Sequence, residues 1–111
     1  MADCIFCSIV AGDIASEILH ATERTVAFRD INPQADLHVL VVPRDHYANV
    51  AELAEGDPAS MAEVVTSARA VAVVAGYDDY RLVFNTGAAA GQTVFHAHAH
   101  VLAGAMKGLP E

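Results

Sequence analysis

Three histidines alternate along a short apolar stretch near the end of the chain: His96, His98 and His100 in FHAHAHV. Side chains at alternate positions of a strand point to the same face, so the three imidazoles are expected to share one face. The outer two would then lie ~13 Å apart, at roughly 3.3 Å per residue, which is too far for all three to bind one metal ion. The spacing therefore predicts that the histidines divide their tasks.

The residues between the histidines are expected to face the opposite way. Ala97 and Ala99, flanked by Phe95 and Val101, form this second face. Alanine is small, so the long helix expected over residues 57–75 can pack close against it, which leaves the histidine face open or polar. As an alternative, three histidines in register can be a chance run or a crude surface metal patch.

Two cysteines, Cys4 and Cys7, form a C-x-x-C pair near the N-terminus. The surrounding segment, MADCIFCSIVAGD, has no positively charged residue before its apolar run, which argues against a signal peptide and predicts a cytoplasmic protein. In that compartment, such a pair indicates metal binding or redox chemistry and not a structural disulfide.

Length and charge narrow the classes of function. The chain has 111 residues, 54% of them hydrophobic, which predicts one globular domain over residues 1–111. The net charge of -8 argues against a nucleic-acid surface, although backbone N–H groups can still hold a single phosphate. No apolar run reaches the roughly 18 residues that a membrane span needs.

Apolar periodicity and chain breakers predict the elements that position these residues. A short helix is expected over 4–11, ended by Gly12, and a long helix begins at Asp57 and Pro58. Strands are expected over 17–21, 25–30, 37–44, 80–85 and 93–102. Because the strands follow one another as meanders, the predicted fold class is α+β, with a five-stranded antiparallel sheet and the long helix on one face.

FHAHAHV resembles the signature of the histidine triad (HIT) family, in which His-x-His-x-His precedes two apolar residues. GQTVFHAHAHVLAG (91–104), DINPQADLHVLVVPRDH (30–46) and CIFCSIVAGDI (4–14) are similar to segments of its Hint-like branch, the purine nucleoside phosphoramidases. The resemblance covers nearly the whole chain, with the motifs in the same order. It implies a HIT-like fold and hydrolysis of AMP amides and related adenylates.

The same resemblance implies a catalytic role for each histidine. His98 corresponds to the nucleophile, which would attack the α-phosphorus and form a nucleotidyl-histidine that water then hydrolyses. His100 would hydrogen-bond the phosphoryl group, and His38 would orient the other ring nitrogen of His98. His96 completes the triad.

The resemblance also implies a nucleotide site. Asp30 corresponds to the residue that accepts hydrogen bonds from the ribose hydroxyls. The matching positions of the purine slot are Ile5, Phe6, Ile9, Phe28 and Ile31, and those around the phosphate are Asn85, Gly91, Gln92 and Thr93. Plain core packing is an equal explanation for the apolar set.

Cys4 and Cys7, together with His46 and His96, resemble the structural zinc site of some bacterial members of the family. Two cysteines and two histidines form a closed tetrahedral site, which would pin the N-terminal helix to the sheet. The alternative is two free buried thiols, with His96 hydrogen-bonding only within the triad.

The resemblance further implies a homodimer with the long helices at the interface, and a purine nucleotide as the partner, with neither nucleic acid nor membrane. Two departures concern specificity: the tail AMKGLPE lacks the usual aromatic residue, and Arg29 stands where a histidine is common. Alternative functions are a dinucleoside polyphosphate hydrolase or phosphorylase of the same superfamily, and a nucleotide-binding regulatory module.

Overall fold

The structure is a computed structural model, and it describes residues 4–108. Its five strands form one antiparallel sheet in the order β1-β2-β3-β5-β4. The strands are β1 (Ile18–Ala21), β2 (Thr25–Arg29), β3 (Ala35–Pro43), β4 (Arg81–Val83) and β5 (Ala99–Met106), and the helices are α1 (Ile5–Ala11), α2 (Val50–Gly56), α3 (Pro58–Val74) and the 3-10 turn η1 (Ala88–Ala90). The predicted α+β class is confirmed. No helix within residues 4–108 is long and apolar enough to cross a membrane.

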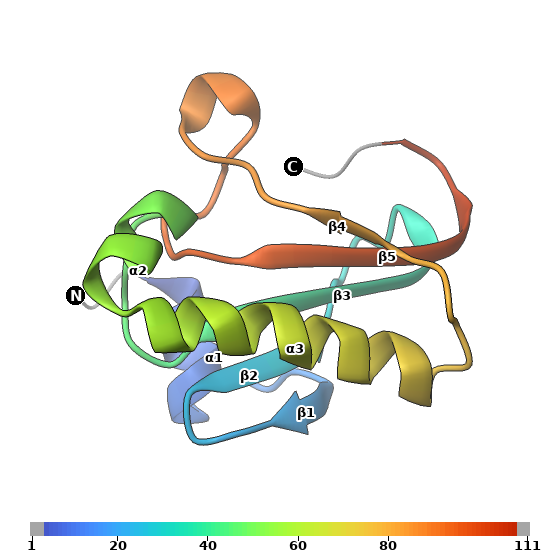
Figure 1. Cartoon of the computed structure of the whole chain (residues 1–111), viewed down its shortest axis with the longest axis horizontal. Coiled ribbons are helices and arrows are strands. Elements are labelled where there is room, and N and C mark those ends of the chain that lie inside the picture. Colours follow the sequence, from blue (N-terminus) through green and yellow to red (C-terminus); the bar gives the residue numbers. More distant parts are fainter. Residues whose placement is uncertain (1–3, 109–111) are drawn as a thin grey trace.

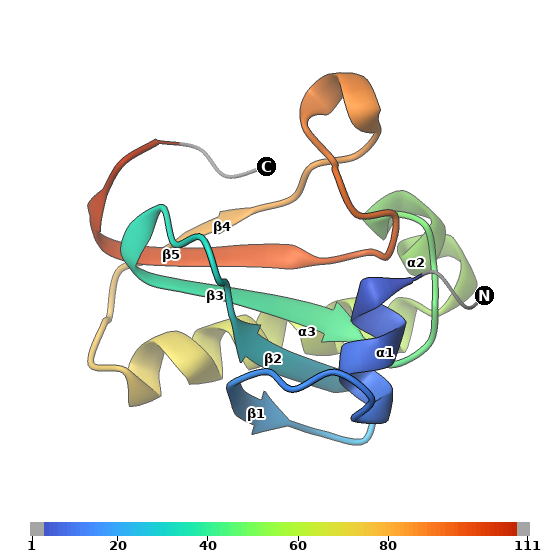
Figure 2. The ribbon, with the colours of Figure 1, turned by 180° about the vertical axis from the view of Figure 1, so that it is seen from behind.

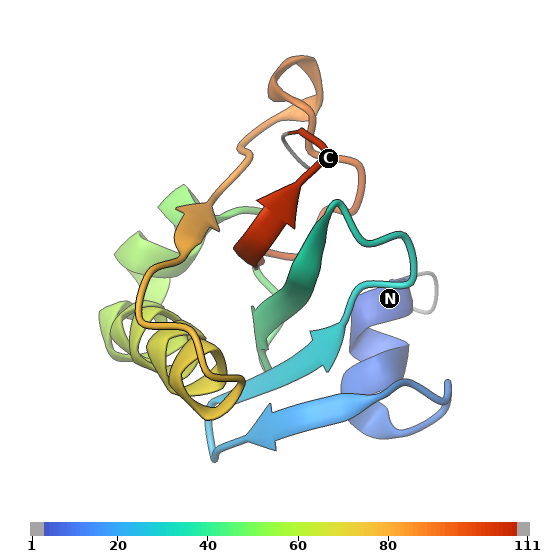
Figure 3. The same cartoon turned by 90° about the vertical axis from the view of Figure 1, so that its right-hand side faces the viewer.

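The sheet separates two apolar clusters. Viewed along the strands, α2 and α3 lie on one side of the sheet and α1 on the other (Figure 3). On the α3 side, Val64 and Ala68 of the helix pack with Ala97, Ala99 and Val101. This confirms the prediction that the alanine face of the histidine segment meets the long helix.

The opposite face carries the histidines and is covered by α1, which lies in front of the sheet in Figure 2. Its cluster joins Phe6 of α1 to Val26, Phe28, Leu40 and Val42. The triad histidines are therefore buried, with exposed fractions of 0–5%. The expected polar face is thus present, but its histidine rings are buried.

The strand order differs from a simple meander. Strands β1, β2 and β3 follow one another, but β3 pairs with β5 and not with β4, which lies at the sheet edge (Figure 1). The connection from β3 to β4 runs through α2 and α3. This crossover puts the histidine strand beside β3 and so beside His38.

The last strand begins later than predicted. The β3–β5 ladder ends at the pair Val41 and Ala99, because Pro43, two residues beyond, has no N–H to donate. The preceding segment bonds elsewhere: the Ala97 amide donates to the Tyr47 carbonyl at 2.7 Å. Phe95, expected on the buried face, is consequently half exposed.

Helix α2 was not predicted. Leu53 is its only buried residue and Val50, one turn earlier, is partly buried, so its apolar repeat covers a single turn. The available signal was the cap, because the Asn49 side chain accepts a hydrogen bond from the Glu52 amide at 2.9 Å. A cap followed by one leucine indicated a helix less strongly than the surrounding turn residues indicated a loop.

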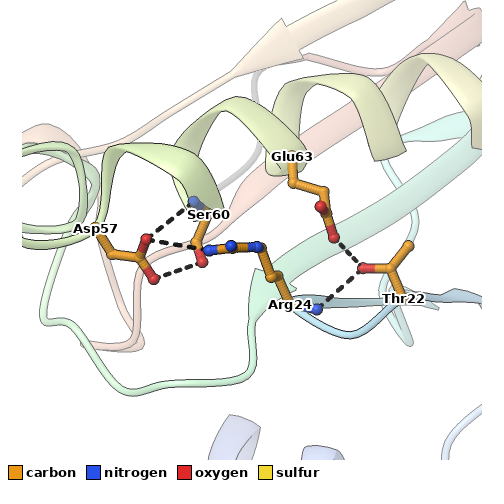
Figure 4. Close-up of polar contacts among 5 residues, drawn as sticks. All are labelled: Thr22, Arg24, Asp57, Ser60 and Glu63. Carbon is orange, nitrogen blue, oxygen red and sulfur yellow. Dashed lines mark hydrogen bonds and ion pairs between the residues drawn. The ribbon is translucent and has the colours of Figure 1, made fainter.

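Polar contacts bind the β1–β2 turn to the start of α3 (Figure 4). Asp57, the N-cap of α3, accepts hydrogen bonds from the Ser60 amide at 3.2 Å and the Ser60 hydroxyl at 2.6 Å. These bonds lower the pKa of Asp57, so its carboxylate stays charged at the helix N-terminus. Arg24 lies 3.5 Å from the same carboxylate, and the Thr22 hydroxyl donates to Glu63.

Replacing Leu53 with alanine tests how α2 is held. Leu53 is fully buried in the α3-side cluster. The substitution is expected to lower the free energy of unfolding by about 2–5 kcal/mol, through lost burial and a residual cavity. Urea unfolding measures the change. Glu55→Ala, at an exposed position of the same helix, should change it by no more than about 0.5 kcal/mol; equal effects would mean that Leu53 does not anchor α2.

Candidate functional site

A pocket of about 380 Å³ opens on the histidine face. This volume is within the range of roughly 300–1,000 Å³ that is usual for small-ligand sites. Its walls come from α1 and the following loop, from the end of β2, and from the segment that leads into β5. The lining residues are Ile5, Phe6, Ile9, Ile14, Ala15, Ser16, Phe28, Arg29, Asp30, Ile31, Leu40, Thr93, Val94, His98 and His100.

His98 holds one tautomer because its Nδ1 faces a group that can only accept. The distance from His98 Nδ1 to the His96 carbonyl oxygen is 2.8 Å, so Nδ1 carries the proton and donates. Nε2 of the neutral ring is then an unprotonated nitrogen. The role predicted for His38, to orient His98, is wrong, because the backbone of His96 does this.

His38 instead pairs with His100. The Gln34 amide donates to His38 Nδ1 at 2.9 Å, so the His38 proton is on Nε2, which donates to His100 Nδ1 at 3.0 Å. The proton of His100 is then on Nε2. Among the described side chains, this Nε2 is the one buried nitrogen or oxygen without a hydrogen-bond partner. A buried N–H beside the pocket is thus available to an acceptor.

The Asp30 carboxylate lies at the edge of this pair. Its Oδ2 is 3.4 Å from His38 Nε2, and its Oδ1 accepts a hydrogen bond from the Asn32 amide at 2.8 Å. The ligand atoms of Asp30, His38 and His100 lie within 4.8 Å of one another, as in a metal site. However, a metal would need a lone pair on His38 Nε2, where the Gln34 amide keeps the proton. We therefore assign the cluster as a hydrogen-bond chain.

Burial keeps these imidazoles neutral. It lowers the pKa of His38, His96 and His98, and it outweighs the attraction of the Asp30 carboxylate for a proton on His38 and His98. Burial, followed by repulsion from His98 and His38, lowers the pKa of His100 to about 3. At neutral pH, the His98 ring thus offers a lone pair and the His100 ring offers an N–H donor.

The structure brings together most of the predicted nucleotide residues. Nine of them line the pocket: Ile5, Phe6, Ile9, Phe28, Asp30, Ile31, Thr93, His98 and His100. The Phe6 ring contacts His98 edge to face at 5.1 Å, so it belongs to both the core and the pocket. Ile31 is 94% exposed and lies at the rim.

Three predicted positions, Asn85, Gly91 and Gln92, are not among the lining residues. The side chain of Gln92 is buried and its amide bonds within the protein, so a nucleotide contact by this residue stays a prediction for its backbone alone. Sequence reasoning missed the wall formed by Ile14, Ala15, Ser16, Leu40 and Val94. Ile14, Ala15 and Ser16 follow α1 directly in the chain, whereas folding brings Leu40 and Val94 to the same pocket. Leu40 had one signal, since it shares a strand face with His38.

Cys4, Cys7, His46 and His96 also come together, with their ligand atoms within 4.8 Å of one another. Cys4 Sγ and Cys7 Sγ lie 3.4 Å and 3.5 Å from His96 Nδ1, and Cys7 Sγ lies 3.4 Å from His46 Nδ1. Zinc bonds of about 2.3 Å to sulfur and 2.0–2.1 Å to nitrogen give tetrahedral S···N distances of roughly 3.5 Å. The donor set and its spacing therefore fit zinc.

Proton placement on His96 agrees with this fit. His96 Nε2 donates to the Pro43 carbonyl at 2.8 Å, which leaves Nδ1 as a lone pair beside the cysteines. In the protein without metal, burial and the neighbouring Cys4 raise the pKa of Cys7. A bound cation would reverse this, because it binds thiolate, so metal binding would release protons. Zinc could supply a structural cross-link between α1 and the sheet.

Comparisons with known proteins agree with this architecture. A family model described as the HIT domain matches residues 11–107. A solved HIT family hydrolase from Clostridium thermocellum is 41% identical, with a TM-score of 0.91 over 98% of this chain and 96% of that chain. Two curated relatives are a 14 kDa zinc-binding protein of Zea mays, 36% identical over 96% of this chain and 85% of that protein, and an adenylylsulfatase of Arabidopsis thaliana, 34% identical over 90% of this chain and 51% of that protein.

The matched range covers the histidines of the site but not the pocket and cysteine residues that precede residue 11. The matched range contains His38, the three triad histidines and Asp30, and it ends just after β5. The solved hydrolase superposes along nearly the full length of both chains. The chain belongs to the HIT domain family.

Proposed function

We propose that this protein is a nucleotide hydrolase of the purine nucleoside phosphoramidase type, which cleaves the P–N bond of AMP amides and related adenylate bonds. The observation that carries the proposal is the opposite polarity of two adjacent rings. The neutral His98 ring has a lone pair on Nε2, whereas His100 has an unpartnered N–H on the same nitrogen. Nucleophilic attack on a phosphoryl group uses one of each.

The reaction has two displacements. His98 Nε2 attacks the α-phosphorus, the P–N bond breaks, and the amine leaves with the bonding electron pair and takes up a proton from solvent. Water then attacks the phosphorus of the nucleotidyl-histidine, loses a proton, and restores the neutral ring as AMP leaves. In both steps, the His100 N–H donates to a phosphoryl oxygen, where negative charge increases.

The pocket supports a nucleotide as the substrate. Its α1 wall supplies apolar side chains for a purine, and the Asp30 carboxylate, at the end of β2, can accept hydrogen bonds from ribose hydroxyls. Thr93 lines the same pocket and brings a hydroxyl toward the phosphate side. One pocket thus combines an apolar wall, a carboxylate and two histidines, the groups that a base, a ribose and a phosphate would each require.

A second candidate is hydrolysis of a mixed anhydride such as adenylyl sulfate. It is favoured by the Arabidopsis relative that is named an adenylylsulfatase, although this chain spans about half of that protein. The same His98 attack would apply, with sulfate as the leaving group.

Two further proposals concern the assembly. The Cys4, Cys7, His46 and His96 cluster is proposed to bind one structural zinc ion, supported by its donor spacing and by the zinc-binding relative from maize. A homodimer through α3 is supported by three exposed apolar side chains on that helix: Val65, Val73 and Val74, with exposed fractions of 40%, 52% and 88%.

Replacing His98 with alanine tests the nucleophile. The variant is expected to lose at least ~10³-fold in kcat with adenosine 5′-phosphoramidate, because no other group can form the covalent intermediate. It should still bind AMP. His20→Asn, which changes a histidine outside the pocket, serves as the control. Retained turnover in the His98 variant would contradict the assignment, and a higher kcat/KM for a diadenosine polyphosphate than for the phosphoramidate would contradict the substrate class.

Metal analysis tests the zinc proposal. The purified protein is expected to contain one zinc ion per chain and to melt at a lower temperature after chelation. At free zinc about 100-fold above its Kd, binding adds about 2.7 kcal/mol of stability. Cys7→Ser should lose both the metal and the response to chelator, whereas His20→Asn should keep them. A wild-type protein without stoichiometric zinc before chelation would contradict the site.

The pH dependence of unfolding tests the neutral state of His100. In the unfolded chain, this group takes up a proton near pH 6.5, but in the folded protein only near pH 3. The free energy of unfolding should therefore fall as pH decreases from 7 to 5, by up to ~1.4 kcal/mol per pH unit from this group. His100→Asn removes its titration, so the stability gap between wild type and variant should narrow over that range. Parallel curves would contradict the buried neutral ring.

A further inference from the structure

Gln92 bonds to three separate parts of the chain through one side chain. Its Oε1 accepts a hydrogen bond from the Gly87 amide at 2.9 Å, and its Nε2 donates to the carbonyls of Ala48 at 2.7 Å and Val94 at 3.0 Å. The side chain is 3% exposed. Both N–H groups and the oxygen of the amide are thus used inside the protein.

The loop between β4 and β5 is anchored by apolar residues at its ends, where Phe84 and Val94 pack against the core clusters. It stands away from the sheet, above β5 in Figure 1. Its turn η1 consists of three alanines, none of them buried, between glycines with φ of 93° and 96°. Within the described stretch 84–95, Gln92 is the only fully buried residue. The position of this loop therefore depends on the Gln92 amide.

The bonds of Gln92 enclose the neighbouring pocket residue Thr93. Two of the bonded residues lie on either side of Thr93 in the chain: Gly87 precedes it, and Val94 follows it. The Ala48 carbonyl accepts a hydrogen bond from the Gln92 side chain, and the Tyr47 carbonyl accepts one from the Ala97 amide, each at 2.7 Å. One short segment thus holds the chain on both sides of the turn from Thr93 to His98.

We propose that Gln92 is a positioning residue: it sets the place of Thr93, and of the glycine-flanked loop, relative to His98 and so fixes where a phosphoryl group is held. This rests on the proposed function, since it concerns the same phosphoryl site. Gln92 does not touch the substrate in this role. Its effect passes through the Thr93 hydroxyl and the loop backbone.

The test is a double-mutant cycle with Gln92→Met and Thr93→Val. Methionine keeps the length of the side chain but makes none of the three hydrogen bonds. It is expected to raise the Kd for AMP and the KM for adenosine 5′-phosphoramidate by about 10- to 100-fold at temperatures where the variant is fully folded. Thr93→Val should weaken binding in the wild type but have a much smaller effect in the Gln92→Met background, because the hydroxyl is already misplaced.

Gln92→Glu is the second variant, in case the methionine variant does not fold. It keeps the acceptor for Gly87 but puts an oxygen in place of the donor that faces Ala48 and Val94. Val71→Ala serves as a matched control, because Val71 is buried in the α3-side cluster but neither lines the pocket nor adjoins the 47–48 segment. It should show near-normal Kd and KM under conditions where both proteins are folded.

The outcomes separate this proposal from the proposed function. An equal effect of Thr93→Val in both backgrounds, or normal Kd and KM in a folded Gln92 variant, would overturn the role of Gln92. Coupled effects on AMP binding without turnover of any AMP derivative would support Gln92 and overturn the hydrolase. Absence of AMP binding by the wild type would overturn both.

Discussion

The chemistry of the site depends on backbone groups that can only donate or only accept. The carbonyls of Pro43 and His96 force a proton onto Nε2 of His96 and Nδ1 of His98, and the Gln34 amide forces one onto Nε2 of His38. Backbone groups do not change protonation state, so these tautomers persist as long as the sheet is intact and the rings stay neutral. Burial secures the second condition, because it disfavours the charged imidazolium. Local backbone groups thus set the tautomers of His38 and His98, whereas the pairing of β3 with the histidine segment sets those of His96 and His100.

Helix α1 joins the two parts of the site. It has seven residues, too few to be stable alone, and its single buried residue is Phe6. Phe6 packs against the rings of His96 and His98, while Cys4 and Cys7 lie beside His96. One short element therefore forms a wall of the pocket and half of the cysteine–histidine cluster. A metal in that cluster would hold the wall in place, which links the proposed zinc to the shape of the pocket.

Much of the fold could be predicted because its signals are local. The alternation of His98 and Ala99, and the apolar repeat of α3, arise from the period of one element. The prediction was less accurate where residues from distant parts of the chain take up hydrogen-bonding groups. The start of β5 depends on Pro43, more than 50 residues away in the chain. The use of the Gln92 amide inside the protein was also hidden, because one of its partners, Ala48, lies 44 positions away. Helix α2 was missed because its apolar repeat, Val50 and Leu53, covers only one turn.

The sequence by itself determined the inventory of the site: five histidines, a carboxylate and two cysteines, with the triad rings on one strand face and small alanines on the other. Only the tertiary structure decided what each ring nitrogen does. His38 meets His100 across 62 positions, and Cys4 meets His96 across 92. The two nitrogens of a neutral imidazole differ only by the place of one proton, and that place is set by the neighbour that folding supplies.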